Sequence, residues 1–183
     1  GITDIPDYMR TAETLTETCR NLYYTFAGSA ITVKTLAWYA REDSPERYAT
    51  WHRDWCMSSM EQALSCYHTD VAIALHRVYW LDFVYCPIGS GKWFQFKNHR
   101  WFEANQGIDL RKAISKDFMR RFEAARMHLS RQIHDSNDEA FKGNGEITMK
   151  KITTLIGKLK TVSFKSSIMT ESSEHFSHSR FMD

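Results

Sequence analysis

The chain has 183 residues, of which 43% are apolar, and it contains eight glycines and three prolines. This composition excludes a disordered chain and a turn-rich β-sandwich, and it predicts one folded domain or two small ones. No apolar run approaches the roughly 20 residues that a membrane helix needs, and the N-terminus does not resemble a signal peptide, so we expect no membrane partner. The start at Gly1 without Met and the abrupt end at Asp183 indicate a piece of a larger protein.

The formal net charge is only +2, but it is unevenly distributed. Residues 1–90 hold seven Lys or Arg against eleven Asp or Glu, whereas residues 111–165 hold thirteen against six. Such asymmetry indicates an electrostatic partner for the basic part, most often nucleic acid. Basic runs on helices are also common as solvated faces, so the charge alone leaves both interpretations open.

The first half of the chain is predicted to be helical. Apolar residues recur at helical spacing over 11–27, 30–42, 46–66 and 70–80. Ser44 and Pro45 suit the N-cap and first position of the third helix, and Thr69 suits the N-cap of the fourth. On the fourth helix, Val71, Leu75 and Val78 are expected to face inward.

After residue 81 the pattern changes to that of three short strands, over 83–86, 92–96 and 100–103. Alternation places Phe94 and Phe96 on one face of the middle strand and Trp93 on the other, and it lets Trp93 and Trp101 approach each other across the strand pair. Gly89-Ser90-Gly91-Lys92 is interpreted as a hairpin turn. A phosphate-binding loop would continue with Ser or Thr and a helix, not with Trp93 and a strand.

The last third of the chain is again helical, over 110–133, 146–161 and 164–176. The first of these helices has an apolar row and, beside it, a basic ridge at Lys112, Lys116 and Arg120 that Arg111 extends. The predicted apolar row consists of Leu110, Ile114, Phe118, Phe122, Ala125, Leu129 and Ile133. Lys142-Gly143-Asn144-Gly145 is interpreted as a break between helices.

The helix predicted over 146–161 places Lys150 and Lys151 outside. Its inward positions are predicted to be Ile147, Ile152, Leu155, Ile156 and Leu159. The predicted fold is therefore mainly α with a small antiparallel β-hairpin or three-stranded sheet, an α+β fold. The predicted regions are 1–137, with the aromatic hairpin and the basic helix, and 146–183, a C-terminal helical segment.

Trp93 to Trp101 reads W-F-Q-F-K-N-H-R-W. This stretch resembles the W-[YF]-x-F-x-x-H-[RK]-W motif of the poxvirus-type helicase-primase family of large DNA viruses, whose C-terminal part is a superfamily 3 helicase. The resemblance extends over roughly residues 30 to 176, through segments such as 33–40, 69–72, 110–114 and 164–167. It implies the region between the primase and helicase domains, with residues 146–183 leading toward a helicase domain outside this chain. It also implies a homo-oligomer that is most simply a hexamer, and ATP and Mg for the parent protein.

No catalytic residue or cofactor site is predicted in this chain. Motifs for a serine hydrolase, a zinc protease or a paired-carboxylate metal site are absent from the sequence. The four cysteines are widely spaced, which favours reduced thiols over a zinc site. Two groups of residues would form a metal site only if the tertiary fold brought their members together. The first is His52, Cys56, Cys66 and His68, and the second is Glu171, Glu174, His175 and His178.

The predicted function is that of a non-catalytic linker or collar domain that contributes to ring assembly and contacts single-stranded or forked DNA independently of sequence. The candidate phosphate contacts are Lys97, His99, Arg100, Arg111, Lys112, Lys116, Arg120, Lys150 and Lys151. Trp93, Phe96 and Trp101 are candidates for stacking bases or for packing.

Two alternatives use the same residues differently. One is a winged-helix-like module, with helices 46–66 and 70–80 followed by the hairpin. The other is a pure oligomerisation scaffold, whose basic face meets acidic residues within 42–61 of the next protomer. The implied location is the host cytoplasm, at the site of viral replication.

Overall fold

The computed structural model describes residues 33–87, 89, 91–97 and 100–178. These form the predicted α+β fold, mainly helical with one antiparallel sheet. A boundary between two units of the chain falls between Pro45 and Glu46. Helix α2, Val33–Asp43, belongs to the first unit. The helix predicted over 11–27 lies outside the described residues.

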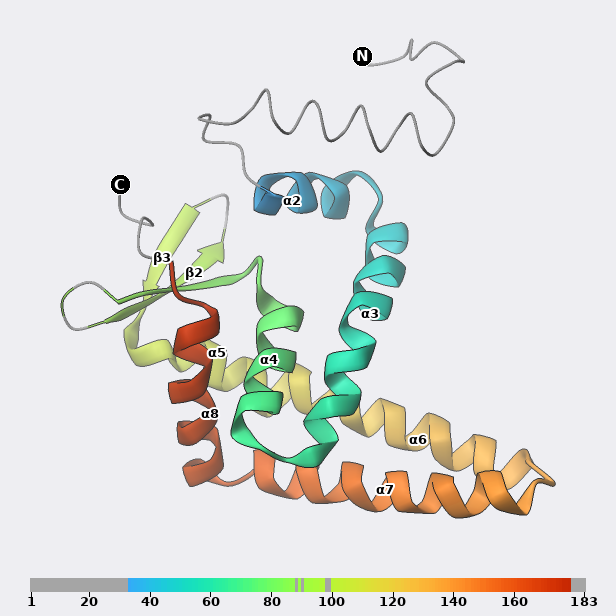
Figure 1. Ribbon diagram of the computed structural model, residues 1–183. Helices are drawn as coiled ribbons and strands as arrows, with labels where there is room; N and C mark the ends of the chain where they lie inside the picture. The colour runs from blue at the N-terminus through green and yellow to red at the C-terminus, as the bar shows by residue number, and fades with distance from the viewer. Residues whose placement is uncertain (1–32, 88, 90, 98–99, 179–183) are drawn as a thin grey trace, which may run out of the picture. The chain divides into compact units, whose positions relative to one another are not determined.

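Helix α4, His68–Tyr79, supplies the centre of the second unit. It follows α3, Pro45–Gln62, and a short 3-10 turn, Ala63–Ser65. Val71, Leu75 and Val78 are buried, as predicted. Helix α8, Val162–His175, lies along α4 (Figure 1). The predicted N-cap at Thr69 is wrong, because the helix already begins at His68 and the Thr69 hydroxyl donates to Glu171 on α8 instead.

The sheet has the order β1-β2-β3, with β1 at Phe83–Cys86, β2 at Lys92–Lys97 and β3 at Arg100–Ala104. Two residues connect β2 to β3, so Lys97 faces Arg100. Each step back along β2 is then matched by one step forward along β3. Trp101 therefore pairs with Phe96, with ring centroids 5.1 Å apart, and Trp93 pairs with Ala104. The expected approach of Trp93 to Trp101 is wrong.

The segment from Gly89 to Lys92 connects two antiparallel strands, as the hairpin interpretation predicted. Gly91 has a φ of +67°, and a Cβ atom there would overlap the Tyr85 hydroxyl. The chain after Lys92 is strand, so this segment lacks the helix N-terminus that a phosphate-binding loop requires. At the free edge of β1, Tyr85 exchanges backbone hydrogen bonds with Phe176 and His178, each 2.9 Å long.

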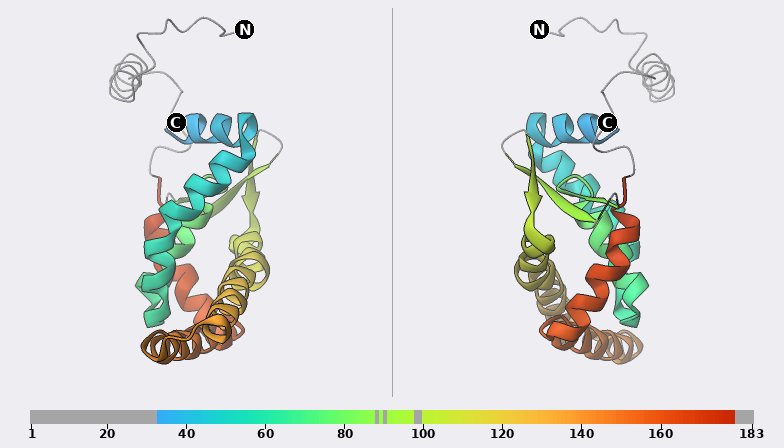
Figure 2. Two further views of the ribbon diagram at one scale, coloured as in Figure 1. Left: turned by 90° about the vertical axis from the view of Figure 1, so that its right-hand side faces the viewer. Right: turned by 90° about the vertical axis from the view of Figure 1, so that its left-hand side faces the viewer.

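The predicted helix over 110–133 is one continuous rod in three parts. It consists of α5 at Ile108–Ala113, a π-helical turn at Ile114–Phe118 and α6 at Met119–Asp135. Figure 2 shows β3 leading into this rod and α7 returning beside α6. In an α-helix, positions four apart drift by about 40° around the axis. A wider π turn reverses that drift, so side chains spaced by four stay in line across it.

Helix α7 runs without a break over Glu139–Leu159, so the predicted break at Lys142–Gly145 and the helix start at 146 are wrong. The Asp138 side chain caps the helix by accepting from the amides of Ala140 and Phe141 at 2.9 and 3.2 Å. Gly145 is buried, and a Cβ atom there would lie 2.6 Å from Ile133 Cδ1 on α6. This glycine therefore permits close packing of α6 and α7. The division of the chain into 1–137 and 146–183 stays a prediction.

One hydrophobic core joins α4, the inner face of the sheet, the α5–α6 rod, α7 and α8. Of the predicted inward positions on α7, Ile152, Leu155, Ile156 and Leu159 are buried. Ile147 is 54% exposed, which contradicts its prediction. In the part of the chain that the structure describes, no helix is long and apolar enough to cross a membrane.

Candidate nucleic-acid interface

Three of the predicted phosphate contacts form a straight row on the α5–α6 rod, here named the basic row. Its members Lys112, Lys116 and Arg120 are exposed and spaced by four residues. Lys112 precedes the π turn, Lys116 lies within it and Arg120 follows it. The turn therefore keeps the three side chains in line.

The end of the hairpin lies next to this row, because one carboxylate contacts a lysine of each. Asp109 lies 3.7 Å from Lys97 Nζ at the end of β2 and 3.8 Å from Lys112 Nζ on α5. Arg100 is exposed and is the cross-strand partner of Lys97. Asp109 offsets one of these charges, so Lys97, Arg100 and the row together keep a net positive charge. The Asp109 pairs are exposed and contribute little to stability. These two ion pairs show instead that the end of β2 lies next to the basic row. His99, the other predicted residue of the hairpin tip, lies outside the described residues.

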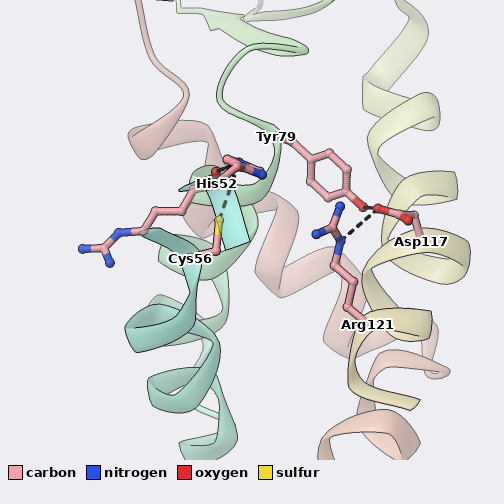
Figure 3. Close-up of polar contacts among 6 residues, drawn as sticks. His52, Cys56, Tyr79, Asp117 and Arg121 are labelled. Atoms are coloured by element: carbon pink, nitrogen blue, oxygen red, sulfur yellow. Dashed lines mark hydrogen bonds and ion pairs between the residues drawn. The ribbon is translucent and has the colours of Figure 1, made fainter. Parts of the chain in front are cut away.

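A polar network joins the π turn of the rod to α4 (Figure 3). The Tyr79 hydroxyl donates to Asp117 Oδ2 at 2.8 Å, and Arg121 Nε donates to the same oxygen at 3.1 Å. Burial, followed by the hydrogen bond to the Asp117 carboxylate, raises the pKa of the Tyr79 hydroxyl far above its ordinary value of 10.0. The tyrosine therefore stays a donor at physiological pH. Asp117 is thus bound by a hydroxyl and a guanidinium, and the Arg121 charge balances its own.

Arg111 is half-buried, whereas the three residues of the basic row are exposed. Its guanidinium donates to Ser166 on α8 at 3.3 Å, and Lys165 of α8 donates to Ser115 at 3.0 Å. Arg111 thus attaches the rod to α8. The prediction that it lies exposed with the ridge is wrong, because α8 lies on this side of the rod and Ser166 accepts a hydrogen bond from the guanidinium.

The aromatic candidate residues do not lie on the same surface as the basic candidate residues of the hairpin tip. Trp93 is only 7% exposed and packs on Phe176 and Tyr85, so it is a core residue. The Phe96–Trp101 pair lies one step along the strands from the Lys97–Arg100 pair. Successive residues of a strand point to opposite faces, so Phe96 and Trp101 lie on the face of the sheet opposite to Lys97. One nucleic-acid strand cannot lie on the basic row and stack on both rings without passing around the hairpin.

Lys150 and Lys151 belong to a different surface. They line a hollow of about 450 Å³ between α7 and the turn that follows α3. The remaining lining residues are Leu64, Ser65, Cys66, Ile147, Thr154 and Lys158. The nine predicted basic residues therefore do not form one site.

The winged-helix alternative requires an exposed second helix. On α4 the residues from Val71 to Tyr79 are largely buried, and the helix is covered by α8. Near its end, the Arg77 guanidinium lies 5.9 Å from the Trp55 ring centroid. The helix order matches that alternative, but α4 presents no face that could enter a DNA groove.

His52 and Cys56 meet on α3, with Sγ 3.6 Å from Nε2 (Figure 3). The same Nε2 lies 3.0 Å from the backbone oxygen of Arg77, which can only accept, so Nε2 carries a proton. Burial raises the pKa of the Cys56 thiol. This nitrogen therefore cannot take a proton from the thiol, and the pair is not a nucleophile and base.

Among the described residues, no group of three or more His, Cys, Asp or Glu could hold a metal ion. Cys56, Cys66 and Cys86 are free thiols. Sequence reasoning did not find Asp109, Asp117 or Tyr79, which organise the interface. Asp109 and Asp117 are acidic residues inside a basic helix, at positions −3 and +1 relative to Lys112 and Lys116. Their negative charge within a basic helix was the feature of the sequence that could have identified these two residues.

No family model matches the chain. It is 25% identical over 145 residues to "Putative helicase L207/L206" of Acanthamoeba polyphaga mimivirus, an alignment that covers 78% of this chain and 15% of that protein. It is 28% identical over 120 residues to "Putative helicase 022R" of Frog virus 3, covering 61% of this chain and 12% of that protein.

The chain is similar to proteins named as helicases of large DNA viruses. This similarity supports a viral helicase-related family. The chain spans 15% and 12% of the length of these two relatives. Their activity as whole proteins therefore reaches this chain only as a proposal.

Proposed function

We propose that residues 46–178 form a non-catalytic collar or linker domain of a viral replication helicase, which contacts DNA through its backbone phosphates. The basic row, with Lys97 and Arg100 beside it, is the contact surface. The observation that carries this proposal is the four-residue spacing of the exposed Lys112, Lys116 and Arg120 across the π turn of a rod that the core and the Tyr79–Asp117–Arg121 network attach to the rest of the fold. The similarity to proteins named as viral helicases supports the setting.

Phosphate contacts by Lys and Arg release counterions and are independent of base sequence. A row of exposed cations on one helical rod suits this kind of binding, because little backbone freedom is lost on contact. The preferred DNA in this proposal is single-stranded or forked. The region lies between a primase and a helicase domain of a poxvirus-type parent protein. In this proposal the parent protein binds ATP and Mg at sites outside this chain. It assembles as a homohexameric ring and works in the host cytoplasm.

The test is a triple charge reversal, Lys112→Glu, Lys116→Glu and Arg120→Glu, with binding to single-stranded and forked DNA measured over a salt series. Loss of three phosphate contacts lowers the salt slope by about 2 on single strands, and affinity falls as well. A matched control reverses Arg53, Lys142 and Lys160, which lie outside the row. Equal losses in the two triple variants, or unchanged affinity in the row variant, would contradict the proposal.

The oligomerisation scaffold stays the second candidate because of an aromatic surface on α3. Trp51 is 49% exposed and stacks on Trp55, with ring centroids 5.7 Å apart and planes inclined by 6°. Tryptophan is enriched where subunits meet, and the acidic residues Glu46, Asp54 and Glu61 lie on the same helix. If the triple variant of the basic row retains its DNA affinity but forms smaller oligomers, as measured by light scattering, the scaffold function is the correct one.

A further inference from the structure

The hollow between α7 and the Ala63–Ser65 turn has the properties of an anion site. Its lining brings together Lys150, Lys151 and Lys158, and no Asp or Glu is among the lining residues that the structure describes. All three lysines are exposed. All three belong to α7, where Lys150 and Lys151 are adjacent and Lys158 lies about two turns farther along, so the basic side of the hollow is formed by this helix.

The neutral polar groups of the lining are already engaged. The Ser65 hydroxyl donates to Asp70 at 2.5 Å, and the Thr154 hydroxyl donates to the Lys150 carbonyl at 3.0 Å. Asp70 is thus an acidic neighbour of this lining, and the serine proton is directed to it. The ammonium groups are therefore the donors that remain for a ligand, and charge would dominate recognition.

Two observations describe the surroundings of Lys158, which is one of the lining residues. Its Nζ lies 5.6 Å from the Phe164 ring centroid, a cation–π contact that restricts the side chain. The pKa of the Cys66 thiol is raised by burial, and the Lys158 charge counteracts that rise. The thiol and the ammonium are thus near neighbours, and Cys66 reports on the charge inside the hollow.

We propose that this hollow binds a terminal phosphate group, either that of a free nucleotide or that at the end of a nucleic-acid strand. Its volume of about 450 Å³ lies within the usual range for small-ligand pockets. Duplex phosphates lie on a convex surface and fit a flat row of cations better than a hollow. A terminal phosphate or pyrophosphate carries more than one negative charge on a small group, which suits a described lining that holds three lysines and no carboxylate. The site is separate from the basic row and goes beyond the proposed collar function.

The experiment measures alkylation of Cys66 by iodoacetamide, followed by mass spectrometry of the peptide that contains it. Inorganic pyrophosphate is the probe, and sodium chloride at equal ionic strength is the reference. A bound anion covers the thiol and raises its pKa, and a rise of about one unit slows alkylation roughly tenfold because only the thiolate reacts. Slowing by pyrophosphate well beyond that by chloride is the expected result.

The variant Lys150→Gln with Lys151→Gln removes two charges from the hollow without truncating a buried side chain, and it should lose the protection. Lys142→Gln with Lys160→Gln is the matched control and should keep it. Protection that persists in the hollow variant, or equal slowing by chloride, would overturn the proposal. The triple variant of the basic row should keep protection by pyrophosphate, so failure of the DNA-contact proposal and failure of this one are distinguishable.

Two oligonucleotides identify the source of the phosphate. Single-stranded DNA with a 5′-phosphate is compared with the same strand without it. Protection by the phosphorylated strand only assigns the hollow to strand ends, and protection by pyrophosphate but by neither strand assigns it to free nucleotides. Equal protection by both strands would mean an ordinary backbone contact and would overturn the assignment to a terminal phosphate.

Discussion

The α5–α6 rod carries two rows of side chains with the same four-residue spacing and opposite surroundings. The first four residues of the predicted apolar row, Leu110, Ile114, Phe118 and Phe122, are 0 to 2% exposed, whereas the basic row on the same rod is in solvent. Farther along, Leu129 and Ile133 are half-buried and Ala125 is exposed, so the predicted place of Ala125 in the apolar row is wrong. Both rows cross the π turn and both are straightened by it. One local feature of the backbone thus serves the core and the surface at once. It follows that stability and partner binding can be changed separately on this rod.

The largest effect is expected on the apolar row. Phe118→Ala should lower the free energy of unfolding by about 3–5 kcal/mol, because a fully buried phenyl ring leaves a cavity. Urea denaturation followed by circular dichroism measures this loss. Lys116→Ala, two positions away on the exposed side, should change stability by at most about 0.5 kcal/mol. A loss below about 1 kcal/mol for Phe118→Ala would show that the face is misassigned.

An intermediate effect is expected where the rod is attached to α4. Tyr79→Phe removes the donor to Asp117 and should cost about 1–2 kcal/mol at neutral pH. Arg121 continues to bond the carboxylate, which limits the loss.

This cost should depend on pH. The pKa of Tyr79 is raised in the folded state, so its stabilising contribution is complete below the ordinary tyrosine value of 10.0. The contribution is lost as the pH rises above that value, because the unfolded chain releases the proton first. The stability difference between wild type and Tyr79→Phe should therefore shrink between about pH 10 and 11, in denaturation curves measured at each pH. A difference that stays constant over that range would contradict the network.

The smallest change in stability is expected at the hairpin tip. Lys97→Ala with Arg100→Ala should leave the melting temperature nearly unchanged, since both side chains are exposed. Trp101→Ala should lower it, because the ring contact with Phe96 contributes roughly 0.5–1.5 kcal/mol beyond area burial. The double variant should still weaken DNA binding or ring assembly. Normal DNA affinity together with normal oligomer size would mean that the tip is only a solvated turn.

Periodicity and alternation alone predicted most of the fold. The strands at 83–86, 92–97 and 100–104 and the inward positions Val71, Ile114, Phe118 and Leu155 follow from local patterns, because burial on one face of an element leaves a period in the sequence. The basic row was likewise visible at 112, 116 and 120, since exposed lysines on a helix repeat with the same period as its core.

Other features depend on partners far away in the sequence. The glycines at 143 and 145 favoured a break, but close packing of Gly145 on Ile133 and the Asp138 cap extend the helix through them. Arg111 has the spacing of an exposed ridge residue, yet Ser166 of another helix engages it.

The separation of the interface into two surfaces was also decided by tertiary structure. The Trp93 to Trp101 motif fixed an aromatic hairpin, but the pairing register and the packing of Phe176 decided that Trp93 is core and that Phe96 and Trp101 face away from Lys97. Lys150 and Lys151 appeared as one more outer face of a helix, and only the approach of the turn after α3 makes them part of the lining of a hollow. A single sequence records the period of each element; it does not record which distant element covers each face.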